Sequence, residues 1–212
     1  MRLRHDPAAA PFVAAHECVL SESDAPAYRG KWRSLFGREA GAKLALEVGI
    51  GRGLFILNSC AANPECCFLG LELRAEMVMQ AIERVKELPP NLFFLQLNAQ
   101  LLPELFAPGE IDTIYINFPD PWPKTKHAKR RLTAPEFLGY YRQVLRGNGD
   151  IRFKTDNLDL FQWSLGNFEQ QGFYLSEVNY SLSEAESGVL TEYEKRFRKK
   201  GQPIYFACAI RE

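Results

Sequence analysis

Short apolar runs recur along the chain from residue 43 onward, separated by stretches in which apolar residues have helical spacing. Runs of about four to eight residues predict buried strands, and longer stretches with apolar residues three or four positions apart predict helices. The predicted strands are Lys43–Val48, Cys66–Leu71, Leu92–Gln96, Thr113–Asn117, Asp150–Lys154, Tyr174–Asn179 and Ile204–Ile210. The predicted helices lie near Gly53–Ala62, Ala75–Glu87, Pro135–Leu145 and Leu158–Gln171.

Strands that alternate with helices are typical of βαβ units, which form parallel sheets. The chain therefore predicts an α/β fold with a doubly wound, seven-stranded, mostly parallel sheet, in which ligands bind at the carboxyl ends of the strands. The Ala- and Pro-rich start predicts a loosely ordered arm over residues 1–30. The length then leaves room for a single domain, over residues 31–212.

Charge and apolar content argue against a membrane or exported protein. The chain carries 26 basic and 26 acidic residues, so its formal net charge is zero. No stretch approaches the roughly 20 apolar residues that span a bilayer, and the first residues lack the apolar segment of a secretory signal. We therefore expect a cytoplasmic protein without a membrane partner. Charges are screened beyond about 10 Å at ordinary salt, so a nucleic-acid partner would need a local basic cluster.

The cysteines and histidines do not indicate a metal site. The cysteines form no C-x-x-C pair, and His5, His16 and His127 show no metal-ligand spacing. An odd, scattered set of cysteines is typical of reduced thiols in a core, so we expect no metal. The five cysteines are Cys18, Cys60, Cys66, Cys67 and Cys208.

A glycine-rich turn follows the first predicted strand, within Glu47–Gly53 (E-V-G-I-G-R-G). Alternate glycines let the backbone approach a ligand closely, although a tight strand-to-helix connection uses the same residues. The dinucleotide fingerprint G-x-G-x-x-G is not met, because Leu54 stands at its third glycine. The negative charge of Glu47 suits a sulfonium and an α-amino group rather than a pyrophosphate. We therefore expect Glu47, Gly49 and Gly51 to bind S-adenosylmethionine.

The next two predicted strands also end in polar groups. Glu72 is placed to accept hydrogen bonds from ribose hydroxyls, although alone it is equally consistent with a solvated strand end. Asn98 and Ala99 follow the third strand and can offer amide and backbone groups to an adenine edge. Because the carboxyl ends of parallel strands meet at one edge of a sheet, we expect these residues to complete the cofactor site.

The fourth predicted strand runs into Phe118–Arg131 (F-P-D-P-W-P-K-T-K-H-A-K-R-R). Three prolines stiffen the start of this segment, and Asp120 and Trp122 can contact a nucleic-acid base there. Cations suited to phosphates follow, although a solvated basic loop has the same composition. The expected contacts to the RNA backbone are Lys126, Lys129, Arg130 and Arg131, together with His127, which is either a phosphate or a pocket contact.

These motifs, in this order, resemble the bacterial type of tRNA (guanine-N7-)-methyltransferase. That family carries E-x-G-x-G-x-G, G-x-E, F-P-D-P-W-x-K-x-x-H-x-K-R-R, T-D-N and T-x-Y/F-E. The third motif is specific to the family, whereas the glycine turn is shared by most methyltransferases of the Rossmann-like class I fold. The resemblance spans about residues 40 to 210, through Glu47–Gly53, Gly70–Glu72, Phe118–Arg131, Thr155–Asn157 and Thr191–Glu194.

The resemblance implies methyl transfer from S-adenosylmethionine to N7 of a guanine in the variable loop of tRNA, with S-adenosylhomocysteine as the other product. It also implies that Asp120 is catalytic, and that Glu47, Glu72, Asn98 and Asp120 contact the cofactor. The tRNA-binding protein is expected to be a monomer or a homodimer. The implied substrate contacts are Lys124, Asp156, Thr191, Glu192, Tyr193 and Glu194.

Several alternatives stay open at this stage. Asp156 and Glu194 compete with Asp120 as the contact to the guanine edge. The basic run Lys195–Lys200 is either a solvated loop or, together with Arg29–Arg33, part of an RNA groove. A methyltransferase acting on an exocyclic amine, and a non-catalytic RNA-binding protein with the same fold, are the two rival functions.

Overall fold

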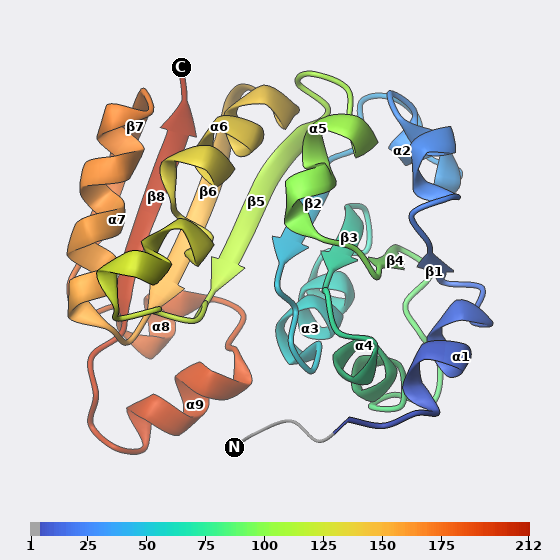
Figure 1. The fold of residues 1–212 in the computed structure, drawn as a ribbon, viewed down its shortest axis with the longest axis horizontal. Coiled ribbons are helices and arrows are strands. Elements are labelled where there is room, and N and C mark those ends of the chain that lie inside the picture. Colours follow the sequence, from blue (N-terminus) through green and yellow to red (C-terminus); the bar gives the residue numbers. More distant parts are fainter. Residues whose placement is uncertain (1–4) are drawn as a thin grey trace.

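The computed structural model describes residues 5–212, whose centre is an eight-stranded sheet (Figure 1). The strand order is β1-β4-β3-β2-β5-β6-β8-β7, and only β8 is antiparallel to its neighbours. This confirms the doubly wound, mostly parallel α/β fold. In Figure 1, β5 points toward the lower edge of the view and β8 runs upward. The strands are β1 (Val19–Leu20), β2 (Leu44–Val48), β3 (Cys67–Leu71), β4 (Leu92–Leu95), β5 (Ile111–Asn117), β6 (Leu145–Thr155), β7 (Phe173–Asn179) and β8 (Tyr205–Arg211).

The sheet has one strand more within residues 5–212 than the seven that the apolar pattern predicted. The additional strand, β1, pairs in parallel with β4 through Val19↔Phe94 and Leu20↔Leu95. A strand of two residues is too short to show an alternation of apolar and polar positions, so the sequence pattern did not reveal it. The other seven strands overlap the predicted ones and differ from them only at their ends.

Helices cover both faces of the sheet because alternate residues of β2 point to opposite sides. Ala45 lies in a core with Ile56 and Val78, on the side of α3 and α4. Leu46 lies in a second core with Leu138, on the side of α6 and α7. The principal helices are α3 (Leu54–Ala62), α4 (Ala75–Ile82), α6 (Pro135–Val144) and α7 (Leu158–Gln170); the shorter ones are α1 (Ala9–Ala14), α2 (Trp32–Leu35), α5 (Leu102–Leu105), α8 (Glu184–Ser187) and α9 (Glu192–Arg198).

The described part of the predicted arm, residues 5–30, packs against the rest of the chain. Helix α1 contacts α4, and Val13 and Cys18 are buried in the core on that side of the sheet. Ala25 is fully buried in the core on the opposite side. This placement differs from a loosely ordered arm, because apolar side chains spread along the segment are covered on both faces. The first four residues of the predicted arm lie outside the described residues.

The amino end of β5 fixes the basic-aromatic segment around Trp32. The Glu110 carboxylate accepts hydrogen bonds from the backbone N–H groups of Gly30 (2.9 Å) and Trp32 (3.0 Å). Arg33 donates to Asp112 Oδ2 at 2.7 Å, in a half-buried ion pair. The hypothesis that Arg29–Arg33 joins an RNA groove with the later basic residues is therefore wrong for Arg33, whose charge is neutralised at the edge opposite the carboxyl ends of the strands.

Candidate functional site

A cleft of about 1690 Å³ lies at the carboxyl ends of β2, β3, β4 and β5. This is the edge at which open α/β sheets bind ligands, because successive loops diverge there to opposite faces of the sheet. Twelve of the expected site residues line the cleft: Glu47, Gly49, Gly51, Glu72, Asn98, Ala99, Asp120, Lys129, Arg130, Thr191, Glu192 and Tyr193. The expected residues that do not line it are Lys124, Lys126, His127, Arg131, Asp156 and Glu194.

The glycine turn after β2 requires a backbone that other residues rarely adopt. Gly49, Gly51 and Gly53 have φ values of 80°, 52° and 74°. A Cβ on Gly53 would lie 2.6 Å from the Cβ of Ala81, so α3 and α4 approach too closely there for any side chain. The N–H groups of Gly49 and Ile50 both donate to Leu71 O, at 2.8 and 3.2 Å. The turn is thereby fixed to the end of β3, and its glycines leave open space beside the cleft.

Glu47 is the most deeply buried acid that lines the cleft, at 3% exposure. Its Oε1 accepts a hydrogen bond from Asn117 Nδ2 at 3.0 Å, whereas its Oε2 is buried and has no partner within the described residues. Burial raises the pKa of Glu47 to about 8, against the effect of the Asn117 hydrogen bond, and the nearby charge of Glu72 raises it further. A buried acceptor without a donor costs free energy, so this oxygen favours a ligand that carries N–H groups and positive charge.

Glu72 follows β3, and the turns around it hold its carboxylate. Oε2 accepts from Gly51 N and Oε1 from Arg74 N, both at 3.1 Å. Burial raises the pKa of Glu72, and the backbone donors from Arg74 and Gly51 oppose that shift. Each oxygen retains a second lone pair, so the oriented carboxylate can accept further bonds from a pair of hydroxyls.

Asn98 and Ala99 begin a 3-10 turn, η2 (Ala99–Leu101), just after β4. The Asn98 side chain caps this turn, because its Oδ1 accepts from Gln100 N at 3.0 Å. Its Nδ2 donates to Gln100 Oε1 at 3.1 Å, on the exposed side. Ala99 is 6% exposed and leaves the cleft wall flat at this point, which suits the edge of a planar ring.

The loop after β5 holds Asp120 at the mouth of the cleft. Phe118 and Trp122, on either side of Asp120, have φ values of 49° and 41°, in a region that L-residues with a side chain rarely adopt. Phe118 N donates to Lys154 O at 2.8 Å and so extends the ladder between β5 and β6 beyond the end of β5. The Asp120 carboxylate is exposed and accepts no hydrogen bond within residues 5–212. Its acceptor capacity is thus available to a substrate.

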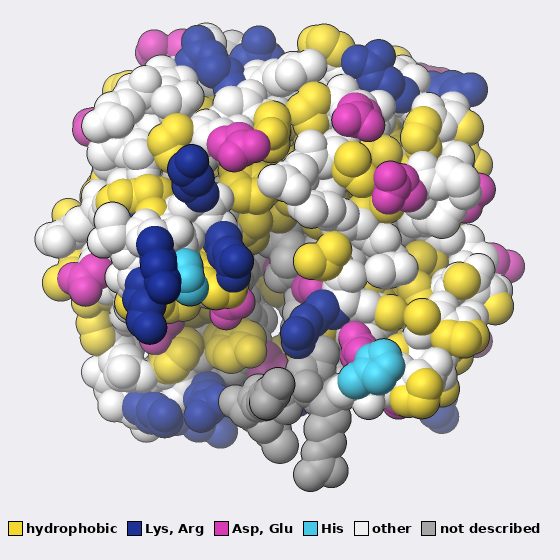
Figure 2. Space-filling view, viewed as in Figure 1, with side chains coloured by type: hydrophobic (Ala, Val, Ile, Leu, Met, Phe, Trp, Pro, Cys, Tyr) yellow, Lys and Arg dark blue, Asp and Glu magenta, His cyan; other side chains and the backbone are white. Residues whose placement is uncertain are grey.

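The basic part of this loop forms a 3-10 helix, η3 (Thr125–Arg130), beside the cleft, where Figure 2 shows Lys and Arg side chains gathered on the surface. Lys124, Lys126, Lys129 and Arg130 are exposed, and the Arg130 guanidinium lies 5.0 Å from the centre of the Trp122 ring. His127 contacts the same ring edge-on, with centroids 5.6 Å apart, and does not line the cleft.

Helix α9 forms the opposite wall of the cleft. Tyr193 is 53% exposed, and its ring stacks on that of Phe118, with centroids 6.3 Å apart and an interplanar angle of 27°. Glu192 makes ion pairs with Arg84 at 3.0 Å and with Arg52 of the glycine turn at 3.9 Å. These pairs link α9 to the amino-terminal half of the domain, so the cleft lies between two walls that ion pairs connect.

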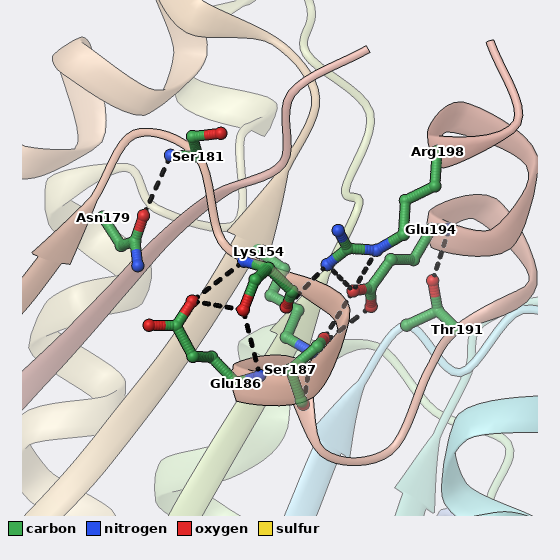
Figure 3. Close-up of polar contacts among 9 residues, drawn as sticks. Lys154, Asn179, Ser181, Glu186, Ser187, Thr191, Glu194 and Arg198 are labelled. Atoms are coloured by element: carbon green, nitrogen blue, oxygen red, sulfur yellow. Dashed lines mark hydrogen bonds and ion pairs between the residues drawn. The ribbon is translucent and has the colours of Figure 1, made fainter. Parts of the chain in front are cut away.

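Glu194 does not line the cleft, and its carboxylate lies in a buried polar cluster (Figure 3). It is fully buried, and its carboxylate contacts Lys154 Nζ at 3.3 Å, Arg198 Nη2 at 2.6 Å and the Ser187 hydroxyl. Although burial acts in the opposite direction, the hydrogen bonds from Ser187 and Arg198 and the charge of Lys154 lower the pKa of Glu194. Thr191 Oγ1 accepts from Glu194 N at 2.9 Å and thereby caps α9.

Three contributors to the site were not expected from the sequence. Asn117 orients Glu47, and Arg52 and Arg84 pair with Glu192. Asn117 is the last residue of β5, directly before the Phe118–Arg131 motif, and its bond to Glu47 joins residues 70 positions apart in the chain. The arginine pairs join segments far apart in the chain, for which a single sequence carries no signal. Asp156 is half-buried just after β6, where burial raises its pKa, against the effect of its own backbone N–H.

Within residues 5–212, no helix is long and apolar enough to cross a bilayer. The same residues contain no group of three or more His, Cys, Asp or Glu side chains with the geometry of a metal site. All five cysteines lack a disulfide partner, and four of them are buried.

The fold matches solved structures of methyltransferases at low sequence identity. The 16S rRNA methyltransferase KamB superposes with a TM-score of 0.66 and 16% identity, covering 86% of this chain and 93% of that one. A 16S rRNA (adenine(1408)-N(1))-methyltransferase from Catenulisporales acidiphilia gives a TM-score of 0.58 and 12% identity, covering 86% and 90%. At these identities the likeness shows the fold alone.

Sequence relatives are much closer. A family model described as a putative methyltransferase matches residues 41–207. The tRNA (guanine-N(7)-)-methyltransferase of Bacillus licheniformis is 44% identical over 208 residues, covering 97% of this chain and 96% of the relative. The enzyme of the same name from Bacillus subtilis is 40% identical over 210 residues, covering 98% and 97%. The chain therefore belongs to the tRNA (guanine-N7)-methyltransferase family.

Proposed function

We propose that this protein transfers a methyl group from S-adenosylmethionine to N7 of a guanine in the variable loop of tRNA. The observation that carries the proposal is the pairing, in one cleft, of a buried acid with a free acceptor oxygen and an exposed acid on a rigid loop. Glu47 provides the first and Asp120 the second. The names of the family relatives supply the substrate, since they specify guanine N7 in tRNA.

The residues around the glycine turn fit a positively charged nucleoside. Glu47 Oε2 would accept the α-amino group, and its negative charge would lie near the sulfonium. Glu72, fixed by the N–H groups of Gly51 and Arg74, would accept the ribose hydroxyls. Asn98 and Ala99 would border the adenine. When bound, S-adenosylmethionine supplies an electrophilic methyl group on a positively charged sulfur.

The acceptor atom decides which groups the protein must provide. Guanine N7 has an in-plane lone pair and no hydrogen, so no residue is needed as a general base. The work of the protein is to hold N7 in line with the methyl group, an effect that contributes much of the acceleration of two-substrate reactions. Asp120 would accept hydrogen bonds from guanine N1 and N2 and stabilise the positive charge that develops on the purine.

Phosphates would bind to the basic surface beside the cleft. Lys124, Lys126, Lys129 and Arg130 are exposed along one loop, and Lys195 and Arg196 lie on α9. A chain of zero net charge thus concentrates cations at the mouth of its cleft, where they would contact the RNA backbone. We infer a cytoplasmic protein, which a tRNA substrate supports.

Methyl transfer to tRNA tests the proposal. Purified protein, radiolabelled S-adenosylmethionine and bulk tRNA from a strain that lacks this modification are incubated, and the digested nucleosides are separated. We expect the label in N7-methylguanosine. Label in N6-methyladenosine would favour the rival enzyme that acts on an exocyclic amine, and tRNA binding without any transfer would favour the non-catalytic rival.

A further inference from the structure

Arg131 makes contacts unlike those of the other cations in its loop. Its Nε donates to Pro121 O at 3.0 Å and its Nη2 to Trp122 O at 3.1 Å. The guanidinium also lies over the ring of Trp163 in α7, 4.3 Å from the ring centre. Its neighbours Lys129 and Arg130 are exposed, whereas Arg131 is half-buried. These contacts occupy the group that we expected to bind an RNA phosphate.

The loop that carries Asp120 has few other ways to hold its shape. Pro119, Pro121 and Pro123 have no backbone N–H, so every second residue of this stretch lacks a backbone donor. Phe118 and Trp122 have positive φ, a conformation that persists in residues with side chains only where surrounding contacts maintain it. Arg131 supplies donors to this loop, because it binds two of its carbonyl oxygens, on the two residues that follow Asp120.

An arginine is suited to this task in a way that a lysine is not. The guanidinium is planar, donates two bonds in fixed directions and stacks on an aromatic ring at the same time. An ammonium group lacks the fixed fork that reaches both carbonyls, and it has no planar face to stack on Trp163. The anchor therefore depends on the shape of the side chain as well as on its charge.

We propose that Arg131 is a positioning residue, which fixes the Asp120 loop against α7 and so holds the Asp120 carboxylate at the cleft. This inference rests on the proposed methyl transfer but assigns Arg131 a role other than phosphate binding. Loss of the anchor lets Asp120 move relative to the guanine. A displacement of about 1 Å in such a group lowers turnover by roughly 100-fold.

The test compares Arg131→Lys and Arg131→Gln with Lys129→Gln as the matched control. For both Arg131 variants we expect kcat to fall by roughly 100-fold, with the tRNA-binding constant and its salt dependence close to those of the unmodified protein. For Lys129→Gln we expect a higher KM and a salt slope smaller by about one. Arg131→Lys keeps the charge, so near-complete rescue of kcat by lysine would overturn the proposal, as would a reduced salt slope with unchanged kcat in Arg131→Gln.

A second measurement needs no turnover. The indole N–H resonances of the three tryptophans are recorded by NMR in the unmodified protein and in Arg131→Lys. We expect the Trp122 and Trp163 resonances to shift, while that of Trp32, fully buried near the opposite edge of the sheet, stays in place and reports an intact fold. Unchanged Trp122 and Trp163 signals would overturn the anchor. Absence of methyl transfer by the unmodified protein would instead contradict the proposed function, so the two failures are distinguishable.

Discussion

Side chains at the cleft differ in how much of their hydrogen-bonding capacity the protein itself uses. Both oxygens of Glu72 accept hydrogen bonds from backbone N–H groups, and one oxygen of Glu47 accepts a hydrogen bond from the Asn117 side chain. Asp120 accepts no hydrogen bond within residues 5–212. The protein thus orients the carboxylate of Glu72 most strongly, and the carboxylate of Asp120 has the most hydrogen-bonding capacity left for a ligand. This difference suits a rigid site for the methyl donor next to a site for the methyl acceptor, where the substrate supplies the missing hydrogen bonds.

At Asp120, we expect Asp120→Asn to lower the rate of methyl transfer by on the order of 100- to 1000-fold, because the carboxylate charge is lost where positive charge develops. Single-turnover kinetics measures this rate, and calorimetry with S-adenosylhomocysteine measures cofactor binding, which should weaken only modestly. The control is Asp159→Asn, at an exposed acid outside the cleft. Complete loss of cofactor binding in Asp120→Asn would make Asp120 purely a binding residue.

Glu47 should make both stability and cofactor binding depend on pH. Its folded-state pKa of about 8 lies above the ordinary value of 4.5, because burial penalises the charged form. The unfolded chain therefore binds fewer protons between these values, and the free energy of unfolding decreases as pH rises from 4.5 to 8. Binding of a cation requires the ionised carboxylate, so cofactor binding at neutral pH should release a proton.

Two measurements check this prediction for Glu47. Thermal unfolding of the unmodified protein and of Glu47→Gln is followed from about pH 5 to 9, the range in which this carboxyl group titrates. The difference in stability should shift in favour of the variant as pH rises. Calorimetry in buffers of different ionisation enthalpy counts the protons released on cofactor binding. A pH-independent stability difference together with no proton release would contradict the assignment.

The residue scale is also where the sequence was most informative. Charge and position after successive strands identified Glu47, Glu72, Asn98 and Asp120, and all four line one cleft. The roles expected for Glu194 and Arg131 do not match where these side chains lie, because an ion pair or a carbonyl anchor depends on partners distant in the chain. A single sequence shows that a charge is present but not which group it contacts.

At the scale of elements, a buried ion cluster joins α8 and α9 to the sheet. Lys154 of β6 contacts Glu194 of α9 and Ser187 of α8, and Arg198 completes the cluster (Figure 3). Buried ion pairs contribute little net stability compared with apolar packing but fix one arrangement of the elements. The ion cluster therefore fixes the cleft wall formed by α9 together with the contacts of Tyr193 and Phe197 with Phe118.

Glu194→Ala separates the two roles considered for this acid. Removing one partner leaves Lys154 buried without its counter-charge, so we expect the free energy of unfolding to fall by about 3–5 kcal/mol. Denaturant unfolding measures the loss, and a double variant, Lys154→Met with Glu194→Gln, should recover part of it. If Glu194 instead binds guanine directly, the single variant will keep its stability and raise only KM for tRNA.

The elements themselves were predicted unevenly. Seven strands and the helices α3, α4, α6 and α7 were predicted from the sequence, because each strand contains a run of mostly apolar residues and each of these helices has at least two turns of apolar positions. The helices α1, α2, α5, α8 and α9 were missed. They span between four and seven residues, too few to establish a period, and α8 and α9 begin at Ser183 and Thr191 caps that we did not use as start signals.

For the whole molecule, the amino-terminal segment is the part in which sequence and structure differ most. We predicted a loose arm at residues 1–30, and the structure packs residues 9–25 onto α4, β4 and α5. Alanine and proline lower the apparent apolarity of this stretch, yet Ala9, Val13 and Ala25 are buried. Small side chains can cover a surface without forming a conspicuous apolar run.

Deletion of residues 1–30 tests which description holds. We expect the truncated protein to unfold at a lower temperature and to aggregate, because the deletion uncovers the edge of β4 and one side of α4. Differential scanning calorimetry and light scattering compare it with the full chain. An unchanged unfolding temperature would support a loosely ordered arm joined to an independent domain that begins near residue 31.

The two ends of β5 have different roles, one in the stability of the fold and the other in the proposed reaction. At its first residues, Asp112 accepts the Leu44 N–H and pairs with Arg33 and Arg146, whereas past its last residue the chain reaches Asp120. In a mutational scan, substitutions at the two ends of β5 should therefore have different effects. Changes near Asp112 should reduce the cellular abundance of the protein. Changes near Asp120 should leave abundance intact and abolish turnover. Substitutions that impair folding and substitutions that impair catalysis should therefore map to opposite ends of a single strand.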